Sequence, residues 1–190
     1  MAKLFIAALL AAALAPSAAF ADDSFFAGAT LSKGGSLTYR NPANGKANTA
    51  DAQSTYKLYG GYTFTNYLAL EGGYLHTGAT HFDKAALGLP NDPTFKRHGF
   101  YAALRPHYQF NDAWSVFGKA GLIRNTFKTT DGAGGAGSMS SVKPLLGVGV
   151  TYNVSRAAAL TLEYEHGGRT RKPGLDIQQN SLQLGVKFGF

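Results

Sequence analysis

Apolar and polar residues alternate along eight segments of this chain, and this pattern constrains the fold more than any other feature. The segments are 24–33, 55–64, 67–77, 99–110, 114–126, 142–152, 158–167 and 180–190. In the last one, Leu182, Leu184 and Val186 alternate with polar residues and glycine. Successive side chains of a strand point to opposite faces, so each segment predicts a strand with one apolar and one polar face. The sequence therefore predicts an all-β protein.

We expect charged residues to lie on only one face of the predicted strands. The charges assigned to this face are Lys57, Glu71, Arg105, Lys119, Glu163, Glu165 and Lys187. In a soluble β-sandwich this face would meet water, whereas in a membrane barrel it would point inward and the apolar face would meet lipid. A Lys or Arg on the lipid face costs roughly 2–4 kcal/mol at the bilayer midplane. The strict exclusion of charge from the apolar face therefore favours the barrel over the sandwich.

Short and long connections alternate between the predicted strands. The short ones are 65–66, 111–113 and 153–157, and the long ones are 34–54, 78–98, 127–141 and 168–179. This alternation is typical of an up-and-down meander with tight turns at one end and free loops at the other. The apolar face is aromatic beside the tight turns, at Phe25, Phe64, Tyr108, Phe110, Trp114, Tyr152 and Phe188. We therefore predict an eight-stranded antiparallel up-and-down transmembrane β-barrel with an aromatic girdle.

The first residues have the three-part pattern of a secretory signal peptide. Lys3 is followed by the apolar run from Leu4 to Leu14, and Ala19-Phe20-Ala21 forms a small-x-small cleavage site. We expect cleavage after Ala21, which would give a signal peptide at 1–21 and a barrel domain at 22–190. Export to the outer membrane of a Gram-negative bacterium makes nucleic acid an unexpected partner, despite the net charge of +7.

Pro106 lies inside a predicted strand and predicts a bulge, or an irregular strand near its periplasmic end.

Five stretches together resemble the OmpA/OmpX-type eight-stranded outer-membrane barrels. They are FFAGATLS (25–32), YLALEGGY (67–74), YQFNDAWSVFGKAG (108–121), LTLEYEH (160–166) and LQLGVKFGF (182–190). The resemblance implies that the last strand, with Phe190, is the signal for the barrel-assembly machinery. It also implies an inward polar plug containing Glu71, Arg105 and Lys119, with Glu163 in the seventh predicted strand. Larger members continue into a peptidoglycan-binding domain, which we do not expect in a chain that stops at Phe190.

The sequence offers little for catalysis or metal binding. It contains no cysteine, and its five histidines lack metal-ligand spacing, so we expect no metal and no cofactor. Barrel enzymes that deacylate lipid A use a membrane-facing Ser and His. His166 lies near the outer end of its strand, but Gly168 stands where that pattern needs a serine, and Ser181 has no matching spacing. We therefore interpret His166 as an interfacial aromatic residue.

Basic residues in the predicted outer loops are candidates for contact with lipopolysaccharide phosphates. They are Lys96, Arg97, Arg169, Arg171 and Lys172. We expect a monomeric, non-enzymatic envelope protein with a structural or surface-interaction role, in contact with lipid, lipopolysaccharide and a host or cell-surface ligand. Two alternatives stay open: a narrow ion pore through the charged interior, and a lipid A-modifying enzyme centred on His166.

Overall fold

The computed structural model describes residues 24–33, 36–40, 45, 47–51, 53–88, 91–130, 135–172 and 175–190. The predicted signal peptide at 1–21 lies outside these residues. The elements are β1 (Phe25–Lys33), β2 (Ser36–Arg40), β3 (Ala47–Asp51), β4 (Thr55–Thr65), β5 (Leu68–His81), α2 (Lys84–Leu87), β6 (Thr94–Gln109), β7 (Trp114–Thr130), β8 (Ala136–Asn153), β9 (Ala158–Lys172) and β10 (Leu175–Gly189).

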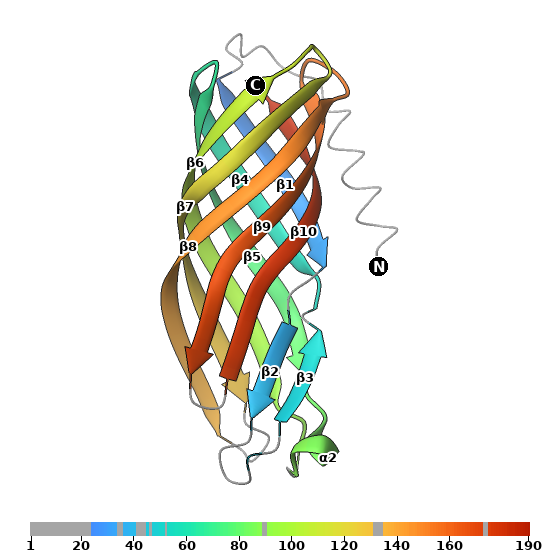
Figure 1. Ribbon diagram of the computed structural model, residues 1–190, viewed down its shortest axis with the longest axis vertical. Coiled ribbons are helices and arrows are strands. Elements are labelled where there is room, and N and C mark those ends of the chain that lie inside the picture. The colour runs from blue at the N-terminus through green and yellow to red at the C-terminus, as the bar shows by residue number, and fades with distance from the viewer. Residues whose placement is uncertain are drawn as a thin grey trace.

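Eight of the strands form a closed barrel of antiparallel neighbours. The order is β1-β4-β5-β6-β7-β8-β9-β10, and β1 closes on β10 from Phe26↔Gly189 to Lys33↔Leu182. The strands are tilted and the tight turns gather at one end (Figure 1). Closure pairs the backbone of both terminal strands, which is the condition for a β-structure to cross lipid. The predicted fold class is thereby confirmed.

The outer end of the barrel contains more regular structure than the sequence predicted. Strands β5 to β10 continue into the segments 78–98, 127–141 and 168–179, and β2 and β3 form a hairpin that pairs with β10. The hairpin and the short helix α2 lie at the end opposite the tight turns (Figure 1). The prediction of free loops was therefore wrong over most of these segments. No helix among the described residues is long and apolar enough to cross a membrane.

The exterior of the barrel is apolar around its middle and aromatic beside the tight turns. Large side chains such as Val148, Leu162 and Leu184 are 43–63% exposed on the protein. Beside the turns, the rings of Trp114 and Tyr152 lie 4.8 Å apart, and other aromatic contacts join Tyr108 to Phe110 and Phe25 to Tyr62. Exposed side chains of this kind need an apolar solvent, and a ring of aromatics is typical of the membrane interface. Short turns are typical of the periplasmic end of such barrels, so the tight-turn end is the periplasmic end.

Pro106 interrupts the ladder between β6 and β7 without inserting a residue. The pairs run to Leu104↔Ala120 and resume at His107↔Phe117 in unchanged register. On the other side of β6, the His107 N–H donates to the Tyr67 carbonyl oxygen at 2.8 Å. The expected irregularity near the periplasmic end is present, and the bulge is not, because both strands use the same number of residues across the gap.

A second proline coincides with the point where β8 and β9 separate. Their pairs run from Asn153↔Ala159 to Leu146↔His166, and the described residues beyond this point pair β8 with β7 and β9 with β10. The two strands diverge toward their outer ends (Figure 1). The Asn153 N–H donates toward β7, to the Ala113 carbonyl. Backbone amides of successive strand residues point to opposite sides, so residue 144 is the next position beyond Leu146 whose amide would donate to β9. Pro144 has no amide hydrogen and cannot make this bond.

Candidate functional site

Buried charges from β5, β7 and β9 meet in the middle of the barrel. The Lys119 Nζ lies 2.7 Å from the Glu71 Oε1 and 2.8 Å from the Glu163 Oε1. Glu71 also accepts a hydrogen bond of 2.6 Å from the Tyr101 hydroxyl. All four side chains are buried. Lys119 is therefore the centre of the cluster, because its ammonium group bridges two carboxylates from two different strands.

Two further buried cations, Lys57 and Arg105, form ion pairs in the interior. Lys57 on β4 forms a buried ion pair with Glu165 on β9. Arg105 on β6 approaches Glu71, with 3.6 Å between its Nε and the Glu71 Oε2, and its guanidinium lies over the Phe117 ring at 3.9 Å from the centroid. Buried charges are tolerated when they are paired and hydrogen-bonded. The cluster therefore joins four of the eight barrel strands across the interior, and the Lys57–Glu165 pair adds a fifth, β4.

One glycine leaves the space that the central cluster occupies. A Cβ atom at Gly147 would lie 2.6 Å from the Glu163 Oε1 and 3.3 Å from the Lys119 Cβ. Gly147 is paired with both Lys119 on β7 and Glu165 on β9, so its backbone stands directly behind the ions. The absence of a side chain at this position lets the carboxylate and the ammonium approach each other.

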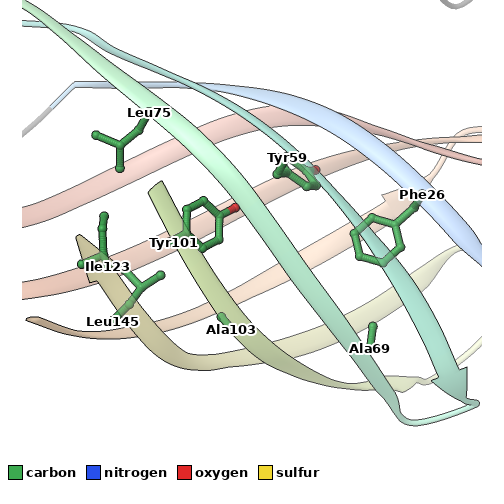
Figure 2. Packing of buried hydrophobic residues seen from close by; sticks show 8 residues of the cluster. All are labelled: Phe26, Tyr59, Ala69, Leu75, Tyr101, Ala103, Ile123 and Leu145. Carbon is green, nitrogen blue, oxygen red and sulfur yellow. The ribbon is translucent and has the colours of Figure 1, made fainter. Parts of the chain in front are cut away.

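The interior above the charges is filled by apolar side chains. Leu75, Ile123 and Leu145 are at most 1% exposed, and they lie at one end of a buried cluster that has Phe26 and Ala69 toward its other end (Figure 2). Tyr59 and Tyr101 lie between the two groups (Figure 2). Phe127 is also fully buried. The interior of an eight-stranded barrel is just wide enough for side chains to fill. Leu75, Ile123, Leu145 and Phe127 fill its outer half.

All seven inward charges predicted from the sequence lie inside the barrel. Six of them are buried, and Lys187 is partly exposed near the periplasmic end. What the alternation did not predict is the pairing, because Lys119 meets residues of strands that are not its neighbours. Among the described residues, no group of three or more His, Asp or Glu side chains is placed to hold a metal ion.

The basic residues of the outer segments do not form one cluster. Lys96 is exposed on β6, but the neighbouring Arg97 points inward and its Nε donates to the Asn125 Oδ1 at 2.8 Å. Arg97 was predicted as a lipopolysaccharide contact in an outer loop, and it belongs instead to the inward face of β6, because adjacent strand residues face opposite sides. Arg169, Arg171 and Lys172 belong to the outer part of β9, and their side chains lie outside the described part of the structure.

Two exposed cations that we did not predict lie beside Lys96. Lys128 on β7 is paired directly with Lys96, and Arg124 stands four pairs further down, opposite Phe100. All three are exposed on the outward face, just beyond the apolar band. We call Lys96, Arg124 and Lys128 the β6–β7 cationic patch. Arg124 belongs to the predicted strand 114–126, so the prediction that its apolar face carries no charge is wrong at the outer end of the strand. Lys128 lies in the segment 127–141, which the sequence predicted to be a loop.

His166 and Ser181 are not arranged as a base and a nucleophile. His166 is exposed on the outward face, where its Nδ1 lies 2.6 Å from the Asn180 Oδ1. Ser181 belongs to the inward face, and its hydroxyl accepts a hydrogen bond from the inward Gln183 amide at 3.1 Å. A serine and a histidine on opposite faces of a sheet cannot share a proton.

The closed barrel, the lipid-facing exterior and the paired interior charges define an integral β-barrel protein of the outer membrane. The model of the OmpA-like transmembrane domain matches residues 20–190, and the chain belongs to that family. Outer membrane protein P5 of Haemophilus influenzae is 30% identical, over 97% of this chain and 59% of that protein. The chain thus spans about 59% of the length of this curated relative. The protein is located in the outer membrane of a Gram-negative bacterium.

Solved structures share the fold at lower identity. Neisserial surface protein A superposes with a TM-score of 0.62 at 18% identity, over 87% of this chain and 97% of that one. The Ail protein of Yersinia pestis gives 0.56 at 17% identity, over 88% and 99% of the two chains. Ail has also been solved in complex with the heparin analogue sucrose octasulfate. At these identities the likeness concerns the fold alone.

Proposed function

We propose that this protein has a structural and surface-interaction role, and that it holds lipopolysaccharide through the β6–β7 cationic patch. The observation that carries the proposal is the direct pairing of Lys96 with Lys128, two exposed like charges on opposed positions of neighbouring strands. Such a pair is destabilising unless an anion lies between its members. None of the three patch residues forms an ion pair within the described part of the chain.

The position of the patch fits the phosphate groups of the outer leaflet. Arg124 follows Leu122 on the outward face, so the cations begin where the apolar band ends. Lys and Arg bind phosphate through charge-assisted hydrogen bonds. Ail binds a polyanion, sucrose octasulfate, and we propose the same class of partner here, with lipid phosphates as the source. We also propose that Arg169, Arg171 and Lys172, in the outer part of β9, contact lipopolysaccharide separately from this patch.

The filled interior supports a structural role over a conducting one, and the opposite placement of His166 and Ser181 supports a non-enzymatic role.

We also propose that the chain is exported by a signal peptide ending at Ala21, and that Phe190 takes part in recognition by the barrel-assembly machinery. Strand β10, which Phe190 follows, is paired with β1 as far as its last residue, because the Phe190 N–H donates to the Phe25 carbonyl oxygen at 2.9 Å.

Stability in vesicles with and without lipopolysaccharide tests the proposed contact. We expect lipopolysaccharide to raise the free energy of unfolding, and the double variant Lys96→Gln/Lys128→Gln to lose about 2 kcal/mol of that gain, since a cation near an anionic surface contributes about 1 kcal/mol. Dephosphorylated lipid A should raise the free energy of unfolding of the wild type by no more than lipopolysaccharide raises that of the double variant. The control is Arg156→Gln, which removes an exposed cation from the periplasmic turn. An undiminished gain in the double variant would rule out the patch as the contact.

A further inference from the structure

The periplasmic end of the barrel interior contains a small cavity of about 40 Å³. Its lining includes Phe26, Thr63, Arg105, Ser115, Thr151 and Lys187. These residues lie close to the tight turns and the barrel seam, and Lys187 is partly exposed, so the cavity is accessible from the periplasmic side. A cavity of this volume has room for more than one water molecule or for one small ion.

The two cations that line this cavity differ in their relation to the ion cluster: Arg105 shares Glu71 with Lys119 and keeps an unpartnered Nε, whereas Lys187 has no partner in the cluster. Arg105 is 5% exposed, and its Nε has no hydrogen-bond partner within the described part of the chain. The nearest carboxylate is Glu71, whose Oε1 already receives Lys119 and Tyr101. Lys187 forms no ion pair with any described carboxylate. None of the described residues that line the cavity is acidic.

Both cations are held against the same aromatic ring. The Arg105 guanidinium lies 5.7 Å and the Lys187 Nζ 5.6 Å from the centroid of Phe26. The stacking of Arg105 on Phe117 fixes the plane of the guanidinium and leaves its edge free to donate. Two like charges confined beside one ring repel each other, and in a low-dielectric interior the repulsion is relieved by an anion between them.

Hydroxyl groups complete the surroundings expected of an anion site. Thr63 from β4, Ser115 from β7 and Thr151 from β8 line the same cavity. A hydroxyl hydrogen rotates to suit its partner, so each of these groups is able to donate to an anion. His107, which is half-buried, also lines the cavity and offers a further ring nitrogen. The donors come from five strands, β4, β6, β7, β8 and the seam strand β10.

We propose that this cavity binds one small inorganic anion from the periplasm, of the size of chloride. The bound anion balances the charge of Lys187, accepts a hydrogen bond from the free Nε of Arg105 and so joins the seam strand β10 to β6. The small volume excludes bulky organic anions. The site is separate from the β6–β7 cationic patch, which lies at the opposite end of the barrel. The failure of either proposal therefore leaves the other intact.

Chloride titration of the folded, isotope-labelled protein in detergent micelles tests this site. Chloride replaces the bulky sulfonate MES at constant ionic strength, and the amide resonances of Thr63, Ser115 and Thr151 are followed by NMR. We expect saturable shifts in the wild type and in Arg156→Gln, a control that removes a cation from the same end of the barrel. In Lys187→Gln the midpoint should rise about tenfold or more, because one charge-assisted hydrogen bond is lost.

Lys187 is partly exposed, so its replacement is expected to leave the barrel folded, and the dispersion of the spectrum reports this directly. Arg105→Lys is the second variant, which keeps the charge and removes the guanidinium edge, and it should also weaken the response. Shifts that grow linearly with chloride, or a Lys187→Gln variant that titrates like the wild type, would overturn the proposal.

Discussion

Replacing Lys119 by Met is expected to lower the free energy of unfolding by about 3–5 kcal/mol, the range observed when one partner of a buried ion pair is removed. Lys119 contacts both Glu71 and Glu163, at 2.7 and 2.8 Å. Its loss leaves Glu163 without any described cation partner, and leaves Glu71 with only the longer contact to Arg105. The measurement is equilibrium unfolding by urea in detergent micelles, followed by the fluorescence of Trp114.

Two matched variants separate the ion cluster from a general effect of the substitution. Lys128→Met makes the same replacement at an exposed position of the same strand, and should change stability by no more than about 0.5 kcal/mol. Adding Glu163→Gln to Lys119→Met removes one orphaned charge, so the double variant should be more stable than Lys119→Met alone. A Lys119→Met barrel as stable as the wild type would show that the cluster does not hold the strands together.

An arginine at Val148 is expected to destabilise the barrel in phospholipid vesicles by roughly 2–4 kcal/mol. Val148 is 63% exposed on the outward face of β8, between the girdle residue Tyr152 and the outer end of the apolar band. This position is near the bilayer midplane, where a cation has neither water nor a counter-ion. The free energy of unfolding, obtained from urea titrations in vesicles, measures the effect.

Val154 provides the control at a different depth. It is 61% exposed, as Val148 is, but it lies in the periplasmic turn between β8 and β9. Val154→Arg should cost only about 0–1 kcal/mol, because the penalty falls toward the interface. Equal effects at the two positions would mean that no lipid surrounds the middle of the barrel.

The sequence predicted the inner parts of the strands because one face there is continuously apolar. It failed beyond residue 126 and before residue 99 because the pattern reverses once a strand leaves the membrane. Phe95 and Phe127 point inward and are buried, while Lys96 and Lys128 point outward and are exposed. The alternation itself continues in these outer parts, although the apolar side chains there face inward. Extending the strands by the two-residue period alone, without requiring the apolar side to face outward, would have predicted them.

The inward position of Arg97 was also available from the period. Arg97 and Arg105 are an even number of residues apart on one strand, so they share a face. The partners of the interior charges were not available in this way. They depend on the stagger of strands around the barrel, which brings Lys119 of β7 to Glu71 of β5 and Glu163 of β9.

The fluorescence of Trp114 in vesicles that carry brominated lipids tests the membrane barrel most directly. Trp114 is the only tryptophan, it is 47% exposed, and it lies in the aromatic girdle beside Tyr152. Bromine atoms near the headgroups should quench it most strongly, and bromine atoms near the chain ends should quench it less, as expected for an interfacial ring. An absence of quenching at every depth would contradict a barrel that spans the bilayer with this face toward lipid.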